Sequence, residues 1–355
     1  MARIRFIATL PFIAMLCACH AVVLNPSGDV AQQQRDLLIY STLLMLIVIV
    51  PVMVMTVLFA WRYRQANSAA RYEPDWDHSI HLELFIWAAP LLIIIGLGGL
   101  TWVGTHLLDP YRALGRIKPG ESTVSAAPPL QVEVVALDWK WLFIYPQYGI
   151  ATVNELAAPL DRPIEFRITA SSVMNSLFIP ALAGQIYAMP GMETKLHAVA
   201  NTAGDYQGFS ANYSGAGFSG MHFMFRALDG RDFEQWLAAR RAAGGVLGRS
   251  DYLRLEQPSE NERVRGFAAV DPSLYRAILN RCVEAGKPCI SDMMVMDAAS
   301  DLGAGAGGSA ASAGIADLAA HASEGEPLLG AGLRPPPAFP SRAPPSLVLH
   351  QAIDQ

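Results

Sequence analysis

Two long apolar segments near the N-terminus constrain the fold of this chain more than any other feature. Residues 37–61 read LLIYSTLLMLIVIVPVMVMTVLFAW, and residues 82–103 read LELFIWAAPLLIIIGLGGLTWV. Each segment is long enough, at ~1.5 Å per residue, to cross the ~30 Å hydrocarbon core of a bilayer as a helix. The proline inside each segment is tolerated in a membrane helix. The sequence therefore predicts a two-helix transmembrane hairpin.

The distribution of arginine predicts how this hairpin is oriented. The connection between the segments contains Arg62, Arg64 and Arg71, whereas Arg35 is the one arginine in the short stretch before the first segment. Basic residues are retained on the cytoplasmic side, so we expect the connection in the cytoplasm and both ends outside. Residues 1–19 have the basic start and short apolar run of a bacterial export signal, which predicts the same topology.

The end of this signal carries two cysteines. The sequence Leu16-Cys17-Ala18-Cys19 is similar to the lipobox of bacterial lipoproteins, in which a cysteine thiol is acylated and becomes the new N-terminus. We expect lipidation of Cys19, which would leave the N-terminus lipid-anchored. The alternatives are an uncleaved first helix or an ordinary signal with incidental cysteines.

Beyond a linker at 104–128, the hydrophobic pattern changes from long runs to short alternating ones. Residues 129–228 contain segments such as LQVEVVAL, PIEFRITA and TKLHAVA, separated by turn residues. Strands of this length and spacing predict a β-sandwich or Greek-key barrel outside the membrane.

The remaining sequence predicts a helical arm and a tail. Residues 229–295 contain the amphipathic pattern DFEQWLAARRAA and a second short helix, DPSLYRAILNRCVEAG. Within this arm, a local disulfide between Cys282 and Cys289 and two unpaired buried thiols are equal alternatives. Residues 296–355 are biased first to Gly, Ala and Ser and then to Pro, so we expect a disordered low-complexity tail.

Composition excludes several classes of protein. The chain is 52% apolar and 16% charged, which is too apolar for an ordinary soluble protein. Its net charge of −5 and the lack of a basic stripe argue against nucleic acid as a partner. Four cysteines without a CxxC pair predict neither a disulfide scaffold nor a structural zinc site.

A glycine-rich segment at 210–221, SANYSGAGFSGM, has the backbone character of a metal-binding loop. The hairpin, DWKWLFIYP at 138–146, MNSLFIP at 174–180 and this loop together resemble subunit II of the haem–copper terminal oxidases, over roughly residues 19–295. The resemblance implies a cupredoxin-like Greek-key β-sandwich in the periplasm. The expected fold is thus a membrane-anchored α+β protein with a short helical C-terminal arm.

In the cytochrome c oxidase branch of that family, the loop C-x-E-x-C-x-x-x-H-x-x-M and an upstream His bind a copper pair. On this chain the corresponding positions keep the methionine alone: Asn175, Ser210, Asn212, Ser214, Phe218 and Met221. A copper pair needs soft thiolates and imidazoles, whereas serine oxygen is hard and phenylalanine has no lone pair. We therefore expect no metal, no cofactor and no catalytic residue on this chain.

Four other residues near the loop have two interpretations each. His197 and His222 are the nearest spare imidazoles, and we favour structural hydrogen bonds over metal bonds for both. The resemblance places Trp139 and Trp141 in a segment that passes electrons in the copper-bearing branch. Without an acceptor beneath them, we interpret both as packing residues of the sandwich or of a subunit contact.

A Ser/Asn/Phe version of this loop resembles the quinol oxidase branch, which includes the cytochrome bo-type ubiquinol oxidases. The resemblance implies a non-copper scaffold subunit of a bacterial inner-membrane complex that oxidises ubiquinol, reduces oxygen to water and pumps protons. Haems and one copper are expected in partner subunit I, with subunits III and IV as further partners. Ubiquinol is soluble in the membrane, so an external copper relay would have no task.

Glu83 lies at the cytoplasmic start of the second apolar segment, where a carboxylate is costly without water or a partner. The resemblance places it near the entrance of a proton-uptake path in subunit I. The alternative is an interfacial carboxylate that reaches the lipid headgroups.

Two further functions compete with the quinol oxidase hypothesis. An electron-accepting subunit II of a cytochrome c oxidase needs the copper ligands that this loop lacks. A membrane-anchored periplasmic binding module unrelated to respiration would explain the hairpin and the sandwich, but not the joint match of the three motifs.

Overall fold

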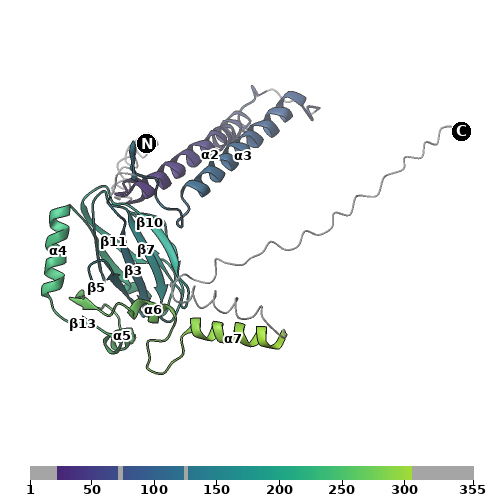
Figure 1. Cartoon of the computed structure of the whole chain (residues 1–355). Helices are drawn as coiled ribbons and strands as arrows, with labels where there is room; N and C mark the ends of the chain where they lie inside the picture. Colours follow the sequence, from purple (N-terminus) through teal and green to yellow (C-terminus); the bar gives the residue numbers. More distant parts are fainter. Residues whose placement is uncertain (1–21, 71–74, 124–126, 306–355) are drawn as a thin grey trace. The chain divides into compact units, whose positions relative to one another are not determined.

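A computed structural model describes residues 22–70, 75–123 and 127–305 of the chain. The predicted signal with Cys19, and the part of the predicted tail beyond residue 305, lie outside these residues. The described chain begins with a short 3-10 helix, η1 (Val22–Leu24), and continues into two long helices and two large β-sheets (Figure 1).

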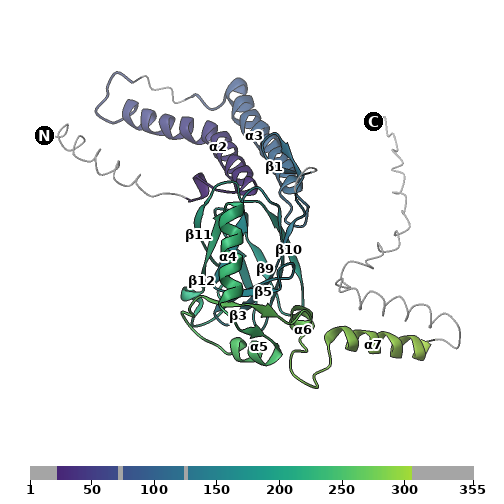
Figure 2. The same ribbon diagram turned by 60° about the vertical axis from the view of Figure 1, so that its left-hand side comes forward.

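The two long helices, α2 (Asp29–Arg62) and α3 (Ile80–Leu107), lie side by side (Figures 1 and 2). Both are long and apolar enough to cross a membrane. A Cβ on Gly104 of α3 would lie 3.0 Å from Cδ2 of Leu37, so this glycine permits close packing of the pair. The predicted hairpin is present, but α2 begins at Asp29 instead of residue 37 because the polar segment DVAQQQRD continues the helix.

The β-domain consists of two large sheets. The first has the order β10-β7-β3-β4-β5-β14, with bounds β3 (Leu130–Leu137), β4 (Lys140–Tyr145), β5 (Ile150–Val153), β7 (Ile164–Ala170), β10 (Thr194–Ala198) and β14 (Arg265–Phe267). The second has the order β6-β12-β11-β8-β9, with bounds β6 (Glu155–Pro159), β8 (Asn175–Phe178), β9 (Ile186–Ala188), β11 (Gly204–Ser210) and β12 (His222–Leu228). Within these sheets, β3 and β7 pair in parallel, as do β6 and β12, and the other neighbours are antiparallel.

Two small sheets complete the β-structure: β1 (Arg116–Lys118) pairs with β2 (Glu121–Ser122), and β13 (Val246–Leu247) pairs with β15 (Ala269–Val270).

The core between the two large sheets is aromatic. The ring of Phe223 on β12 lies 5.7 Å from that of Trp141 and 4.9 Å from that of Phe143, centre to centre, and both partners are on β4. Gly208 on β11 makes room for this ring, since a Cβ at that position would lie 2.1 Å from the Phe223 side chain. The interdigitation of these rings fixes the spacing of the two sheets.

The outer face of the six-stranded sheet is also buried, under the C-terminal arm. The helices of the arm are α4 (Gly230–Ala242), α5 (Arg249–Glu256) and α6 (Leu274–Leu279). A second apolar cluster joins side chains of the sheet, such as Val135 and Leu142, to Tyr252 and Leu274 of the arm. The arm also supplies strand β14 to the sheet, so it is an integral part of the β-domain and not an appendage to it.

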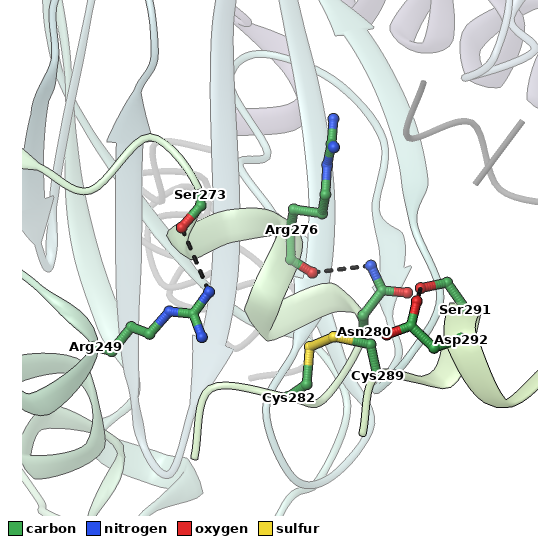
Figure 3. Close-up of a disulfide and its surroundings, with 8 residues drawn as sticks. All are labelled: Arg249, Ser273, Arg276, Asn280, Cys282, Cys289, Ser291 and Asp292. Carbon is green, nitrogen blue, oxygen red and sulfur yellow. Dashed lines mark hydrogen bonds between the residues drawn. A yellow bond between two sulfur atoms is a disulfide. The ribbon is translucent and has the colours of Figure 1, made fainter. Parts of the chain in front are cut away.

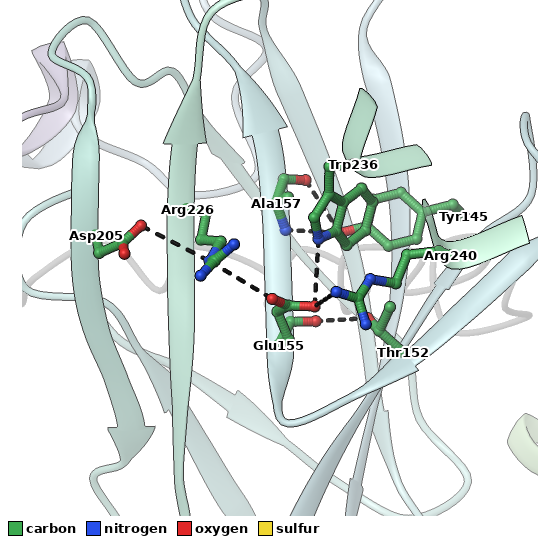
Figure 4. A network of polar contacts seen from close by, with 8 residues as sticks. All are labelled: Tyr145, Thr152, Glu155, Ala157, Asp205, Arg226, Trp236 and Arg240. Carbon is green, nitrogen blue, oxygen red and sulfur yellow. Dashed lines mark hydrogen bonds and ion pairs between the residues drawn. The ribbon is translucent and has the colours of Figure 1, made fainter. Parts of the chain in front are cut away.

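A buried carboxylate connects α4 to the five-stranded sheet (Figure 4). Glu155 on β6 accepts a hydrogen bond from Nε1 of Trp236 at 3.2 Å and pairs with Nη2 of Arg240 at 3.3 Å. On its other side Arg226 of β12 lies 3.5 Å away. Two guanidinium groups and one indole therefore compensate the desolvation of this carboxylate.

Cys282 and Cys289 are joined in a disulfide that follows α6 (Figure 3). The backbone N–H of Ile290 then donates to the carbonyl of Asn280 at 3.0 Å, which closes the loop. The next helix, α7 (Ile290–Gly305), lies almost entirely in a second compact unit that begins at Ser291. Helix α7 includes residues 296–305, which the sequence assigned to a disordered tail. Alanine at 298 and 299 and methionine at 296 favour a helix there.

The start of α2 is fixed to the β-domain. The hydroxyl and backbone N–H of Ser27 donate to the carbonyl of Ala181 at 3.0 and 2.8 Å. A Cβ on Gly28 would lie 2.6 Å from the carbonyl oxygens of Leu182 and Val199, so only glycine fits there. Val30 joins the core between the sheets, which makes the first turn of the helix part of the sandwich.

A polar cluster interrupts the outer face of the six-stranded sheet. Glu133 on β3 lies beside Arg167 on β7 in the parallel register, and Nε of Arg167 lies 3.0 Å from Oε1 of the enclosed Glu193. Burial raises the pKa of Glu133 to about 7, the charge of Glu193 adds to the rise, and Arg167 opposes it. The ionised form of Glu133 is therefore disfavoured in the folded state.

We predict that Glu133→Gln stabilises the protein at about pH 8 by about 1–3 kcal/mol and has much less effect at about pH 5. A carboxyl pKa that folding raises from 4.5 to about 7 reduces stability progressively as the pH rises through that interval. The measurement is chemical unfolding of the solubilised protein at the two pH values, followed by tryptophan fluorescence. The exposed Glu234 on α4 provides the control, since Glu234→Gln should give equal small changes at both. An equal effect of Glu133→Gln at both pH values would contradict the prediction.

Candidate functional site

The glycine-rich loop at 210–221 connects two neighbouring strands of the five-stranded sheet, β11 and β12. Its second half contains a short 3-10 helix, η3 (Phe218–Gly220), closed by the N–H of Met221 donating to the carbonyl of Phe218 at 3.1 Å. At the base of the loop, the N–H of Ser210 donates to the carbonyl of Met221 at 3.3 Å. The loop is therefore a folded part of the sheet and has the compact form that a metal loop requires.

Hydrogen bonds connect three of the predicted ligand positions. The Ser210 hydroxyl lies 3.1 Å from Oδ1 of Asn175 on β8 and 3.1 Å from the carbonyl oxygen of Asn212. Ser210 and Asn175 are 3% and 1% exposed, so this contact is shielded from water. The Asn212 side chain donates to the carbonyl of Met174 at 3.2 Å, which fixes the loop to the start of β8. Neutral hydrogen bonds thus stand where the copper branch has metal bonds.

The other three positions differ in their surroundings. Met221 is buried at 1% exposure and belongs to the core between the sheets. Oγ of Ser214 is buried, with no hydrogen-bond partner among the residues that the structure describes. Phe218 is only half-buried, and its ring packs edge-on against the exposed Tyr213 at 5.5 Å. Phe218 therefore lies at the loop surface and does not belong to the core between the sheets.

Trp139 covers the glycines of the loop. Its indole Nε1 donates to the carbonyl of Ser214 at 3.0 Å. A Cβ on Gly217 would lie 2.6 Å from the indole, and Gly215, at φ +120°, would place one 2.9 Å from it. These glycines are required for the close approach of the ring, and Trp139 serves as a packing residue of the loop.

The nearby histidines do not form a metal site with the loop. Nδ1 of His197, on β10, lies 3.1 Å from the carbonyl oxygen of Pro110, directly after α3. His222 is exposed, and its ring packs edge-on against Phe209 at 6.1 Å. Across residues 22–70, 75–123 and 127–305, no three His, Cys, Asp or Glu side chains gather as a metal would need. The loop keeps the residue spacing of a copper site but not its donor chemistry, so the residues present do not fit a copper pair.

Sequence reasoning missed Lys140, which binds the segment of the C-terminal arm that lies beside the loop. Its ammonium group donates to the carbonyls of Asp138 and Gln257 at 3.1 and 2.7 Å and to the Ser259 hydroxyl at 2.7 Å. Burial is the main reason why the pKa of Lys140 is lowered. Through these bonds, a segment of the arm is fixed beside the loop, where Asn261 approaches Gly220. The lysine inside the aromatic run DWKWLFIYP was the signal for this role.

Glu83 lies at the other end of the molecule, in the first turn of α3. Its side chain is exposed, and its backbone N–H donates to the carbonyl of Ser79 at 2.9 Å. A carboxylate in this turn also interacts favourably with the positive end of the helix dipole.

Comparison with known proteins agrees with this geometry. Residues 146–228 match the family model "Cytochrome C oxidase subunit II, periplasmic domain", and residues 241–286 match "COX Aromatic Rich Motif". The chain is 48% identical over 279 residues to cytochrome bo(3) ubiquinol oxidase subunit 2 of Pseudomonas putida, covering 78% of this chain and 86% of that protein. It is 47% identical to ubiquinol oxidase subunit 2 of Acetobacter aceti, covering 79% and 88%.

Among solved structures, the periplasmic domain of cytochrome oxidase subunit II of Bradyrhizobium japonicum matches at 21% identity and a TM-score of 0.30. It covers 31% of this chain and 91% of that chain.

The fold defines a class: a cupredoxin-like oxidase subunit II with two helices that are long and apolar enough to cross a membrane. Within that class, the chain belongs to the family of cytochrome bo(3) ubiquinol oxidase subunit 2. The electron-accepting subunit of a cytochrome c oxidase is not favoured.

We predict that returning the ligands to the loop creates a copper site. A variant with Asn175→His, Ser210→Cys, Ser214→Cys and Phe218→His, with Met221 retained, should bind copper and absorb visible light, because these positions keep the ligand spacing and Ser210 contacts Asn175. Copper analysis and visible spectra of the purified variant provide the measurement. The same variant without Ser214→Cys is the control and should lack the paired-copper spectrum. A well-folded variant that binds no copper would show that the frame itself has changed.

Proposed function

We propose that this chain is a non-copper scaffold subunit of a proton-translocating ubiquinol oxidase in a bacterial inner membrane. The main support for the proposal is the hydrogen bond between Ser210 and Asn175. It joins two of the predicted ligand positions through groups that cannot transfer electrons. The names of the relatives support ubiquinol as the electron donor of the complex. In this proposal the β-domain is a scaffold that contacts the other subunits of the complex. The redox chemistry takes place in those other subunits.

The partners in this proposal are subunits I, III and IV of the oxidase. Subunit I would bind the haems and a single copper, which together supply the reduction of oxygen to water. This chain would present its two apolar helices to lipid and to subunit I, with the β-domain in the periplasm. The exposed apolar surfaces of α2 and α3 support such contacts. Acylation of Cys19 would add a second attachment to the membrane.

The donor preference of the purified complex tests this function. We expect the complex that contains this chain to oxidise ubiquinol and not reduced cytochrome c, and to contain haem and a single copper per complex. The measurements are oxygen consumption with each donor, and metal and haem analysis. Matched substitution of Met221→Leu, which removes the one retained soft ligand, should leave ubiquinol oxidation unchanged. Preferential oxidation of cytochrome c, or a further pair of coppers on this chain, would refute the proposal.

We further propose that Glu83 contributes to proton uptake, since its exposed carboxylate lies in the first turn of α3, at the end of the helix that the arginine distribution assigns to the cytoplasm. Glu83→Ala should lower ubiquinol oxidase turnover several-fold without reducing assembly, because a proton-accepting group is lost at the entrance of the path. Turnover and haem content of the reconstituted complex provide the two readouts. Glu234→Ala, an exposed carboxylate on α4, is the control and should change neither. Normal turnover of the Glu83→Ala complex would show that Glu83 has only an interfacial role.

A further inference from the structure

Two carboxylates and one guanidinium group meet under the C-terminal arm, on the outer face of the six-stranded sheet. Glu133 on β3 is half-buried and lies beside Arg167 on β7 in the parallel register. Nε of Arg167 lies 3.0 Å from Oε1 of Glu193, whose side chain is 0% exposed. The second carboxylate oxygen of Glu193, Oε2, is buried and has no hydrogen-bond partner among the residues that the structure describes. A single guanidinium group therefore compensates poorly for two ionised carboxylates in this site.

Helix α6 of the arm covers this cluster with Tyr275. The residue is 5% exposed, and the centre of its ring lies 6.0 Å from Cζ of Arg167. Its hydroxyl is also buried without a hydrogen-bond partner in the described part of the chain. Burial, and then the charges of Glu193 and Glu133, raise the pKa of this hydroxyl, so it remains protonated. The helix thus places a neutral group beside the two carboxylates.

The charges of Arg167 and Glu193 are the ones that act on Glu133. On β4, the apolar Ile144 lies opposite Glu133, and Lys140 at the other end of that strand is bonded to the arm. The other titratable or charged side chains on β7, β10 and α6 are half-buried or exposed: Glu165, Lys195, His197 and Arg276. Water and salt screen such groups more than enclosed ones, so the balance inside the cluster depends on Arg167.

Helix α6 is attached to the sheet more weakly than the strands are attached to one another. In the described chain, the backbone hydrogen bonds that residues 274–282 donate end at carbonyls of residues 271–278 and not at the sheet. The contact with the sheet is side-chain packing, through Leu274, Tyr275 and Ile278 in the second apolar cluster. A short helix without backbone bonds to its neighbours opens at a lower free energy than the strands beneath it. A repulsion inside the cluster would therefore act first on α6.

We propose that Glu133 and Glu193 hold one proton between them while α6 is packed on the sheet, and that loss of this proton to water opens α6. With the proton bound, the cluster has one negative and one positive charge. Without it, two carboxylates face one guanidinium group in an enclosed site, and this repulsion is relieved when Tyr275 moves away and water enters. The arm is then a pH-sensitive cover of the sheet, whatever the electron donor of the complex is.

The test is hydrogen–deuterium exchange of the intact complex, measured by mass spectrometry and corrected for the intrinsic pH dependence of exchange. Burial, together with the charge of Glu193 and against that of Arg167, raises the pKa of Glu133 from 4.5 to about 7. A carboxyl pKa that packing raises favours the open form progressively as the pH rises through that interval. The protection of residues 274–282 should therefore fall about 30-fold between about pH 5.5 and about pH 8.5. Helix α4 is the internal reference and should keep its protection.

Two variants separate the shared proton from a general effect of pH. Glu133→Gln should keep α6 protected at both pH values, because one carboxylate then faces Arg167. Glu193→Gln should also weaken the pH dependence, because Glu133 can then ionise beside Arg167. Glu234→Gln, at an exposed carboxylate on α4, is the matched control and should behave as wild type.

Haem content confirms assembly of each variant, and the Glu133→Gln result decides alone if Glu193→Gln does not assemble. Equal protection of α6 at both pH values in the wild-type complex would overturn the proposal. So would an equal loss of protection in α4 and α6, or an unchanged pH dependence in either variant.

Discussion

The rest of this structure depends on the burial of one sheet on both of its faces. The inner face of β3 and β4 packs against β12 through Trp141, Phe143 and Phe223, and the outer face packs under the arm through residues such as Val135 and Leu142. Apolar burial on two sides contributes about twice the stabilisation per strand that a one-sided sheet receives. Because of this support, the edge strands and loops are free to vary in chemistry without loss of the fold.

The glycine-rich loop illustrates this freedom. Its backbone remains connected to β8, to Trp139 and to the arm, although none of these contacts requires a metal. Ser210 and Asn175 satisfy each other, so the loss of copper ligands leaves few buried polar groups without partners. The compact shape of the loop therefore depends on these hydrogen bonds and on packing against Trp139.

Sequence reasoning predicted the parts of the fold that have a strong local signal. The two apolar runs gave the hairpin, and the alternating segments gave the sandwich, because helix length and strand period are written into consecutive residues. It missed contacts between residues distant in sequence, such as Lys140 with Gln257 or β5 with β14. It also gave no position for the Phe218 ring, since spacing alone does not show on which side of a loop a ring lies. The site residues were found because the loop motif preserves their spacing, whereas their hydrogen bonds required coordinates.

The attachment of α2 has a mechanical consequence. Val30 is already inside the sandwich core, and Gly28 pairs with Ala200, so no flexible hinge separates the first helix from the sheets. A second connection follows α3, where Pro110 contacts His197. A domain fixed to both helices cannot move between an electron donor and an electron acceptor as a carrier domain on a flexible linker does. The first turn of α2 and the two sheets therefore share one packed core, so the helix continues directly from the β-domain without a flexible linker.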